Sequence, residues 1–340
     1  MKVLVSGGAG FIGGCTVRDL LKSGHEVVVF DNLSCGHKEI LPKGIELILG
    51  DIRKPQDIRS ALHGRKFDAV MHFAAFTIVP ESVEDPEKYF ENNVQGSVNV
   101  MNAMAKEGVG LFVFSSSAAV YGAPKQIPIT ETAPTLPENP YGQTKLTIEE
   151  YLKWYEAPYG IKHVCLRYFN AAGADLENDI GEDREVETHL IPLVLHAASG
   201  ARKDVKVFGT DYPTTDGTCV RDYIHVKDLS SAHVLALEKL GATKTSAIYN
   251  LGSESGFSVR QIVEAAKKIT GKSINAVDSP RRAGDPPALI AKADQAAALL
   301  GWRPDFIDIR KTISTAWNWH QSSSKKQGDH SGRSTKGERL

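Results

Sequence analysis

Short apolar segments alternate with longer amphipathic segments throughout the first half of the chain. Short apolar runs bounded by turn residues are typical of buried strands, whereas apolar positions that recur at helical spacing predict helices. The predicted strands are 3–5, 27–30, 45–49, 69–73, 111–114 and 164–166, and the predicted helices lie near 11–23, 55–63, 87–107 and 141–157. Strands that alternate with helices form a parallel sheet covered on both faces. We therefore predict an α/β fold with a Rossmann-type, doubly wound parallel sheet.

The regular alternation stops after about residue 170. Glycines and a charged run over 173–185 predict a loop, and the elements that follow are mixed. We expect a first domain over 1–170 and a smaller, mixed α/β lobe over 171–320, from which some segments return to the first domain. The last segment, 321–340, has no apolar pattern and predicts a disordered tail.

Composition and charge limit the possible classes of function. Of the 340 residues, 41% are hydrophobic and 24% are charged, as in ordinary globular proteins. The net charge of −1 provides no basic field that would attract nucleic acid or an anionic membrane. No apolar run approaches the roughly 20 residues of a membrane helix, and the first strand begins too early to leave room for a signal peptide. We expect a cytoplasmic protein that binds neither nucleic acid nor membrane.

The cysteines and histidines give no indication of a metal site. The four cysteines are Cys15, Cys35, Cys165 and Cys219. They are widely spaced and form no C-x-x-C pair, so we expect neither a zinc site nor a disulfide framework. Reduced thiols fit a cytosolic protein. The eleven histidines also lack the spacing of metal ligands, and we predict no bound metal.

The first predicted strand leads directly into glycines at Gly7, Gly10 and Gly13. This spacing permits a tight turn, the close approach of a pyrophosphate and tight packing of the following helix. The N-terminus of that helix provides free N–H groups for the phosphates. Asp31 ends the second strand, where a carboxylate suits a ribose 2′-hydroxyl and repels a 2′-phosphate. The order of these elements predicts NAD as the cofactor, and the alternative is a glycine-rich turn in another kind of α/β protein.

A second group of residues indicates proton chemistry. Tyr141 and Lys145 are four residues apart and therefore share one face of a predicted helix. A lysine ammonium beside a phenol lowers the phenol pKa from its usual value near 10. A phenolate near a carbon that carries a hydroxyl is a general base. Ser117, the last of three serines after a predicted strand, can share the proton path. We predict Ser117, Tyr141 and Lys145 as the catalytic residues.

Together these motifs resemble the extended short-chain dehydrogenase/reductase family and, within it, the 4-epimerases of UDP-sugars. The resemblance extends from Met1 to about His320. The matching stretches are 7–10, 31–34, 72–75, 115–122, 139–142, 166–170, 208–213, 220–226 and 281–285. The last three separate this group from other sugar-nucleotide enzymes. The resemblance implies a first domain that binds NAD and a second lobe that binds the substrate.

The implied activity is NAD-dependent epimerisation at C4 of a UDP-sugar through a 4-keto intermediate. UDP-glucose and UDP-galactose are the expected pair, and UDP-N-acetylhexosamines, UDP-pentoses and UDP-hexuronates stay open as alternatives. A sensor that binds NAD without turnover is a further alternative. By the resemblance, Tyr141 abstracts the 4′-hydroxyl proton, Lys145 contacts the nicotinamide ribose and Ser117 orients the hydroxyl. Related dehydratases carry an acid pair where this chain has Ala118 and Ala119, and alanine cannot transfer a proton.

The same resemblance assigns the binding residues and a homodimer. The cofactor contacts are Gly7, Gly10, Phe11, Ile12, Gly13, Asp31, Asn32, Asp51, Ile52, Phe73, Ala74, Asn92, Tyr141, Lys145, Tyr168 and Phe169. Three of them have ordinary structural alternatives: Asp51 can cap a turn, Phe73 can belong to the core, and Asn92 can satisfy backbone groups. The homodimer is expected to form through helices matching 87–107 and 141–157.

The expected substrate contacts are Ser117, Asn170, His189, Phe208, Arg221, Tyr223, Arg282, Asp285 and Leu289. Arginines on separate segments, Arg221 and Arg282, suit a diphosphate. Asp285 suits the uridine ribose, while Phe208 either flanks the uracil or belongs to the core.

Three positions depart from the pattern of the relatives. Thr77 stands where many of them carry a lysine that faces the cofactor. The pair Thr188-His189 replaces two asparagines, and His189 remains a candidate donor to a phosphate or sugar. Leu289 occupies the position that sets the size of the sugar pocket. Its intermediate volume leaves the acceptance of N-acetylated sugars open.

Overall fold

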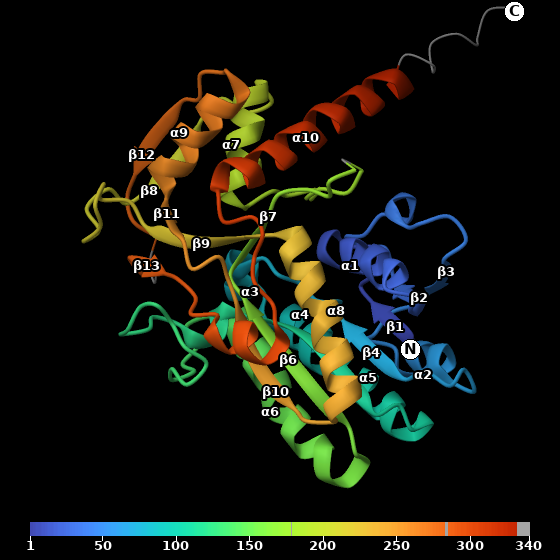
Figure 1. Ribbon diagram of the computed structural model, residues 1–340. Coiled ribbons are helices and arrows are strands. Elements are labelled where there is room, and N and C mark those ends of the chain that lie inside the picture. Colours follow the sequence, from blue (N-terminus) through green and yellow to red (C-terminus); the bar gives the residue numbers. More distant parts are fainter. Residues whose placement is uncertain (178, 283–284, 332–340) are drawn as a thin grey trace, which may run out of the picture.

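A seven-stranded parallel sheet forms the centre of the protein (Figure 1). The structure is a computed structural model that describes residues 1–177, 179–282 and 285–331. The strands of the sheet are β1 (Lys2–Ser6), β2 (Glu26–Asp31), β3 (Glu46–Leu49), β4 (Ala69–His72), β5 (Leu111–Ser117), β6 (Lys162–Tyr168) and β10 (Ala247–Leu251). Their order is β10-β6-β5-β4-β1-β2-β3, and every neighbouring pair is parallel. This sheet confirms the predicted α/β fold and the strands predicted from the apolar segments.

Helices cover both faces of the sheet, as is typical of parallel sheets. On one face α1 (Phe11–Lys22) packs beside α8 (Val226–Thr243) over one hydrophobic cluster. On the other face α2 (Pro55–Leu62), α5 (Gly96–Glu107) and α6 (Pro140–Tyr159) cover a second cluster. The shorter elements of this part are the 3₁₀-helices η1 (Lys38–Ile40) and η3 (Ala118–Tyr121), the helices α3 (Val79–Glu84) and α4 (Pro86–Tyr89), and the π-helical η2 (Phe90–Gln95).

A smaller lobe begins at β7 (Asn170–Ala172). Its remaining elements are α7 (Leu190–Ser199), β8 (Val205–Phe208), β9 (Val220–His225), β11 (Gly256–Ser258), α9 (Val259–Thr270), β12 (Ala276–Ser279), β13 (Ala288–Leu289), the π-helical η4 (Ala296–Leu300) and α10 (Ile309–Ser331). Strand β9 pairs with β7, β11 and β13, and β8 pairs with β12. Between these elements the chain returns to the central sheet through α8 and β10, so the two parts share helices and loops.

Residues 321–331 belong to the segment 321–340, for which we expect a disordered tail. These residues continue α10 as a helix that extends away from the body of the protein (Figure 1), and residues 332–340 lie outside the described part. The sequence here lacks an apolar pattern, but lysine and glutamine are good helix formers. Because elongation of an existing helix is easier than nucleation, the packed first turns of α10 allow it to continue.

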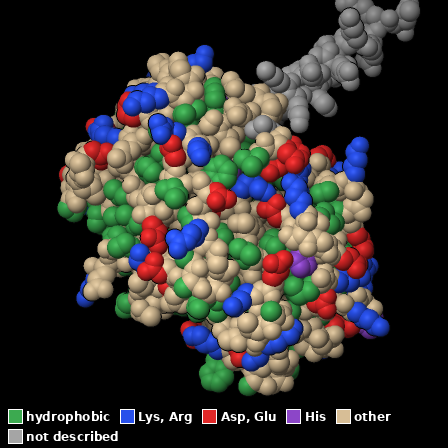
Figure 2. Space-filling view, in the orientation of Figure 1, with side chains coloured by type: hydrophobic (Ala, Val, Ile, Leu, Met, Phe, Trp, Pro, Cys, Tyr) green, Lys and Arg blue, Asp and Glu red, His purple; other side chains and the backbone are tan. Residues whose placement is uncertain are grey.

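The distribution of charge on the surface and the hydrophobicity of the helices bear on the expected partners. On the face shown in Figure 2, acidic and basic side chains are interspersed over the molecule. Within the described residues, we find no helix whose length and hydrophobicity would allow it to cross a membrane.

An ion pair between Glu149 of α6 and Arg167 of β6 lies inside the protein, with side chains 1% and 5% exposed. Arg167 donates to the carboxylate from Nε at 3.0 Å and from Nη2 at 2.5 Å. The Ser116 hydroxyl of β5 donates to the same carboxylate. Arg167 Nη1 donates to the Tyr121 hydroxyl at 2.9 Å, and that hydroxyl donates to Asn250 of β10 at 2.7 Å. The network therefore joins α6 to three neighbouring strands.

We expect Glu149→Gln to destabilise the protein strongly. The substitution keeps the shape of the side chain but leaves the Arg167 guanidinium buried without a counter-charge, which costs about 3–5 kcal/mol. Urea denaturation measures the loss in the free energy of unfolding. Glu150→Gln is the matched control, because Glu150 pairs with Lys153 at the surface, where both side chains are about half exposed and such a pair contributes about 0–1 kcal/mol. A small loss in both variants would contradict the role of the buried pair.

Candidate active site

The glycine loop between β1 and α1 is packed too closely for side chains. A Cβ on Gly7, whose φ is +77°, would lie 2.5 Å from the backbone nitrogen of Ala74, and a Cβ on Gly13 would lie 2.2 Å from the carbonyl oxygen of Gly7. Gly10 is the N-cap of α1, and no side chain of the described residues caps the helix there. The first N–H groups of α1 are therefore free to bind an anion. The loop has the geometry that a pyrophosphate requires.

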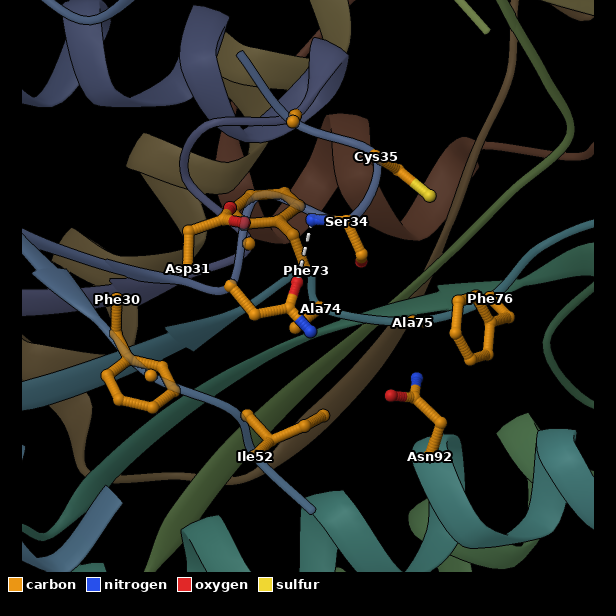
Figure 3. Close-up of a pocket in the computed structure, with 15 residues that line it drawn as sticks. Phe30, Asp31, Ser34, Cys35, Ile52, Phe73, Ala74, Ala75, Phe76 and Asn92 are labelled. Atoms are coloured by element: carbon orange, nitrogen blue, oxygen red, sulfur yellow. Dashed lines mark hydrogen bonds between the residues drawn. The ribbon is translucent and has the colours of Figure 1, made fainter. Parts of the chain in front are cut away.

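A cavity opens beside this loop, at the carboxyl ends of β1, β2 and β4, where ligands of α/β proteins bind. Figure 3 shows Asp31 and Asn92 at separate ends of the cavity, with the Asn92 amide directed into it from a helical segment. Eight predicted cofactor residues contribute to the lining: Gly7, Gly10, Asp31, Asn32, Ile52, Phe73, Ala74 and Asn92.

Asp31 determines which dinucleotide suits the cavity. It is the one charged residue among the described residues that form the lining. Its carboxylate accepts hydrogen bonds from the amides of Ala9 at 3.0 Å and Leu33 at 2.8 Å, which hold it at the end of β2. A carboxylate in this place suits a ribose hydroxyl and repels a 2′-phosphate. Together with the glycine loop, this residue fits NAD.

Eight predicted cofactor residues lie outside this cavity lining: Phe11, Ile12, Gly13, Asp51, Tyr141, Lys145, Tyr168 and Phe169. Gly13 supports the loop through its contact with Gly7. The Asp51 carboxylate accepts hydrogen bonds from the backbone and guanidinium of Arg53 and from Asn32. The hydrogen-bonded Arg53 side chain holds the pKa of Asp51 at about 2. The structure therefore favours the alternative for Asp51, a capped turn.

Sequence reasoning missed other lining residues, namely Phe30, Ser34, Cys35, Gly36, Gly50, Ala75 and Phe76. The need for glycine at Gly36 is visible only in the folded structure, where a Cβ would lie 2.8 Å from the carbonyl carbon of Ala9. Ser34 and Ala75 belong to stretches quoted for the resemblance. Their position directly after a predicted strand could have identified them.

The predicted catalytic residues meet at the carboxyl end of β5. The Ser117 hydroxyl lies near enough to the Tyr141 phenol to act on its pKa, and both residues are buried. Lys145 lies one turn along α6, where its Nζ donates to the carbonyl oxygen of Ser115 at 2.8 Å. Tyr168 closes the group from β6, with its hydroxyl 2.6 Å from the Ser115 hydroxyl. The structure thus brings Ser117, Tyr141 and Lys145 together as the sequence predicts.

The electrostatics of this group differ from the expectation that Lys145 lowers the phenol pKa. Burial raises the pKa of Tyr141, and the Ser117 hydroxyl and the Arg184 guanidinium oppose part of the rise. Burial also lowers the pKa of Lys145 to about 7, against the opposing effect of Glu149. Lys145 Nζ lies 5.9 Å from the centre of the Tyr141 ring and is directed at a backbone carbonyl. The two side chains are close together, but burial removes water from both the phenol and the ammonium and so opposes the charged form of each.

Asn93 connects the cavity to the catalytic helix. Its amide oxygen accepts the backbone amide of Phe76 at 2.9 Å, and its amide nitrogen donates to the Phe76 carbonyl at 3.0 Å. The same nitrogen donates to the hydroxyl of Thr144 at 3.2 Å, next to Lys145 on α6. Since Phe76 lines the cavity, this buried amide holds the catalytic helix beside the cofactor cavity.

The predicted substrate residues of the second lobe form pairs. Arg221 Nη2 donates to the Asp285 carboxylate at 2.8 Å, although we expected the two residues to make separate contacts. Leu289 lies opposite Arg221 in the pairing of β13 with β9. Asn170 lies opposite Tyr223 in the pairing of β7 with β9. Strand β9 therefore positions most of this set.

The remaining substrate residues also have partners. The Arg282 guanidinium stacks over the Phe208 ring at 3.9 Å, and positions 283–284 of this motif lie outside the described residues. His189 Nδ1 donates to the Glu182 carboxylate at 2.6 Å, which leaves its Nε2 for another contact. Burial by itself would raise the pKa of Glu182, but His189 and Arg184 hold it below its usual range.

Comparisons with known proteins place the chain among NAD-dependent epimerases. The model of the NAD dependent epimerase/dehydratase family matches residues 3–252. The UDP-glucose 4-epimerase of Lacticaseibacillus casei is 49% identical over 329 residues, which are 97% of this chain and 99% of that protein.

Two crystal structures show the same similarity. The UDP-glucose 4-epimerase from Brucella ovis in complex with NAD has a TM-score of 0.90 and 45% identity, and the match covers 93% of this chain and 97% of that one. The enzyme from Bifidobacterium longum in complex with NAD⁺ and UDP has a TM-score of 0.90 and 38% identity, with 95% and 99% covered. Both the motifs and these similarities extend over most of the chain. The protein therefore belongs to the NAD dependent epimerase/dehydratase family.

Proposed function

We propose that the protein is an NAD-dependent 4-epimerase that interconverts UDP-glucose and UDP-galactose. The observation that carries this proposal is the meeting of Ser117, Tyr141 and Lys145 at the carboxyl end of β5, beside a cavity that fits NAD. The relatives described above are UDP-glucose 4-epimerases that match almost the whole chain, which supports the same reaction.

The three catalytic residues divide the proton chemistry at C4 of the sugar. Tyr141 takes the proton of the C4 hydroxyl as a general base. Ser117, whose hydroxyl lies near the phenol, orients the C4 hydroxyl. Lys145, one turn along α6, would contact the nicotinamide ribose. When bound, NAD⁺ supplies reversible acceptance of a hydride. The epimer forms when C4 regains its hydride on the other face of the sugar and Tyr141 returns the proton to the C4 oxygen.

Residues around the cavity would select NAD and hold it in place. The glycine loop with the N-terminus of α1 would hold the pyrophosphate, and Asp31 would hold the adenosine ribose. Asn92 and the backbone of Phe73 and Ala74 would contact the rest of the dinucleotide along the cavity.

The second lobe would hold the UDP portion of the substrate. Arg221 and Arg282 come from separate segments, and guanidinium groups bind phosphate oxygens in a fork geometry. The Asp285 carboxylate beside Arg221 would accept from the uridine ribose. Leu289 packs against the hydrophobic cluster of Ala118, Val120, Tyr121 and Ile129, which begins directly after Ser117, so we place it at the sugar end of the site.

The segment after Ser117 argues against a dehydratase. Elimination across C5 and C6 needs an acid and a base, and the two residues that follow Ser117 are alanines in the short helix η3. Ala118 and Ala119 provide neither group. Simple oxidation and return at C4 needs only the catalytic residues already named.

We also propose a homodimer that works in the cytoplasm. Helix α6 presents Tyr151 and Trp154 at its surface, 42% and 79% exposed, and Phe90 of the neighbouring η2 is 40% exposed. Large aromatic residues exposed on adjoining helices are typical of an interface. All four cysteine thiols are free, which suits a reducing compartment.

Conversion of UDP-galactose to UDP-glucose by the purified protein, followed by chromatography, tests the proposed activity. We expect conversion without added cofactor, because NAD is regenerated in each cycle and can stay bound. If UDP-galactose is not converted even with added NAD, a panel of UDP-N-acetylhexosamines, UDP-pentoses and UDP-hexuronates follows. Turnover of a pentose with failure on both hexoses would replace the proposed substrate.

Tyr141→Phe removes the general base and keeps the aromatic ring. We expect turnover to fall by about 10²–10⁴-fold, whereas binding of the nucleotide sugar, measured by calorimetry, stays close to that of the unchanged protein. Tyr159→Phe is the matched control, because Tyr159 lies at the exposed end of the same helix. Turnover at the original rate in the Tyr141 variant would reject the mechanism.

Light scattering tests the dimer. We expect a mass of twice the 37.0 kDa of the chain. Trp154→Glu places a charge in the proposed interface and should shift the population to the monomer, while Leu136→Glu, at an exposed apolar residue in a loop, should leave the mass unchanged. A mass near 37.0 kDa for the unchanged protein would remove the dimer from the proposal.

A further inference from the structure

Arg184 lies in the loop between β7 and α7 and connects the two parts of the protein. Its Nη1 donates to the Thr77 hydroxyl at 3.0 Å, and its Nε donates to the Glu182 carboxylate at 2.9 Å. Thr77 follows β4 in the sequence, 107 residues before Arg184. These contacts fix a guanidinium from the second lobe against the wall of the cofactor cavity.

The segment around Thr77 leads directly to the catalytic tyrosine. Phe76, the residue before Thr77, lines the cavity, and Figure 3 shows it at the end away from Asp31. Two residues after Thr77 helix α3 begins, and its Ser82 hydroxyl accepts the backbone amide of Tyr141 at 3.2 Å. The Arg184 guanidinium is therefore held at the catalytic end of the site rather than at its phosphate end.

The counter-ion of Arg184 is itself fixed. The Glu182 side chain is 6% exposed and binds both Arg184 and His189. The hydrogen bonds to Glu182 and Thr77 use two of the five N–H groups of the guanidinium. Arg184 is 27% exposed, so its charge is only partly screened by solvent. The loop thus presents an anchored cation.

Few charged groups of the described residues face the Tyr141 phenol. Lys145 approaches from the same helix, Tyr168 from β6, and Tyr89 from α4. The titratable groups beyond Tyr89 are Glu81 and Lys88, and those beyond Arg184 are Glu182, Glu187 and His189.

The two cations near the phenol behave differently with pH. Burial lowers the pKa of Lys145 to about 7, so part of the lysine is neutral near neutral pH. A guanidinium keeps its charge at every pH that proteins tolerate. Arg184 acts to lower the pKa of Tyr141 and also that of Tyr168, against the larger effect of burial. Arg184 therefore keeps its positive charge, which acts on the phenol, at a pH where part of Lys145 is neutral.

We propose that Arg184 acts on the reaction through Tyr141: its guanidinium, anchored by Glu182 and Thr77, stabilises the ionised phenol that removes the substrate proton. Arg184 is in this sense a positioning residue, contributed by the substrate-binding lobe to the proton chemistry of the cofactor-binding part. The role in the reaction rests on the proposed function, whereas the effect of Arg184 on the pKa of Tyr141 can be tested without it.

Titration of the phenol in the NAD-loaded enzyme tests the proposal without turnover. The near-ultraviolet absorbance of tyrosinate is followed against pH, and the difference from Tyr141→Phe isolates Tyr141. In Arg184→Gln we expect the pKa of Tyr141 to rise by about 0.5–1 unit, since a neighbouring cation favours the charged phenol. The acidic limb of the kcat profile should move to higher pH by the same amount.

Three further variants separate a charge effect from a structural one. Arg184→Lys keeps the charge and should restore the titration. Thr77→Val removes the hydroxyl that fixes the guanidinium and should raise the pKa of Tyr141 part of the way, which also tests the proposal if Arg184→Gln folds poorly. Arg260→Gln removes a surface arginine that pairs with Asp278 and should change nothing.

The outcomes are distinct. An unmoved titration in Arg184→Gln, with or without a lower melting temperature, would mean that Arg184 only anchors the loop, and the proposal would be wrong. A shifted titration in a protein that fails to epimerise any UDP-sugar would keep the electrostatic role and reject the proposed function. A shift equal to that of Arg184→Gln in Arg260→Gln would show a general surface effect and would also reject the proposal.

Discussion

The buried ion pair of Glu149 and Arg167 is the constraint on which the active site depends. It joins α6 to β6 and, through Ser116, to the strand that carries Ser117. Tyr141 lies two turns before Glu149 on the same helix. Because the pair sits where no water can replace a lost partner, sliding of α6 along the sheet would leave a buried charge unpaired. The distance between the phenol and the serine is therefore set by an interaction outside the site itself.

A second constraint is the close approach of backbone to backbone around the cofactor cavity. Gly7 and Gly13 leave no room for a Cβ, and the Asn93 amide holds the cavity wall at Phe76 to the catalytic helix at Thr144. Side chains that would fill the cavity are excluded by these contacts, while the N–H groups of α1 stay available. Rigid support of this kind allows a bound dinucleotide and the catalytic helix to keep one relative position.

The proton chemistry takes place where burial works against ionisation. Both the phenol of Tyr141 and the ammonium of Lys145 are desolvated, which opposes the charged form of each. Charge must then come from groups fixed at the edge of the site, and the loop of the second lobe provides Arg184 there. The lobe that would bind the sugar nucleotide therefore also takes part in the electrostatics of the base.

By itself the sequence determined the alternating strands and helices, the glycine loop with Asp31, and the serine, tyrosine and lysine proposed as catalytic, because periodicity and short motifs are local properties. It did not determine that Asp51 would pair with Arg53, that Arg221 would pair with Asp285, or that residues 321–331 would continue α10. The position of Arg184 and the raised phenol pKa were also decided only by the tertiary structure. Burial and charge pairing depend on residues far apart in the chain, and folding alone brings those residues into contact.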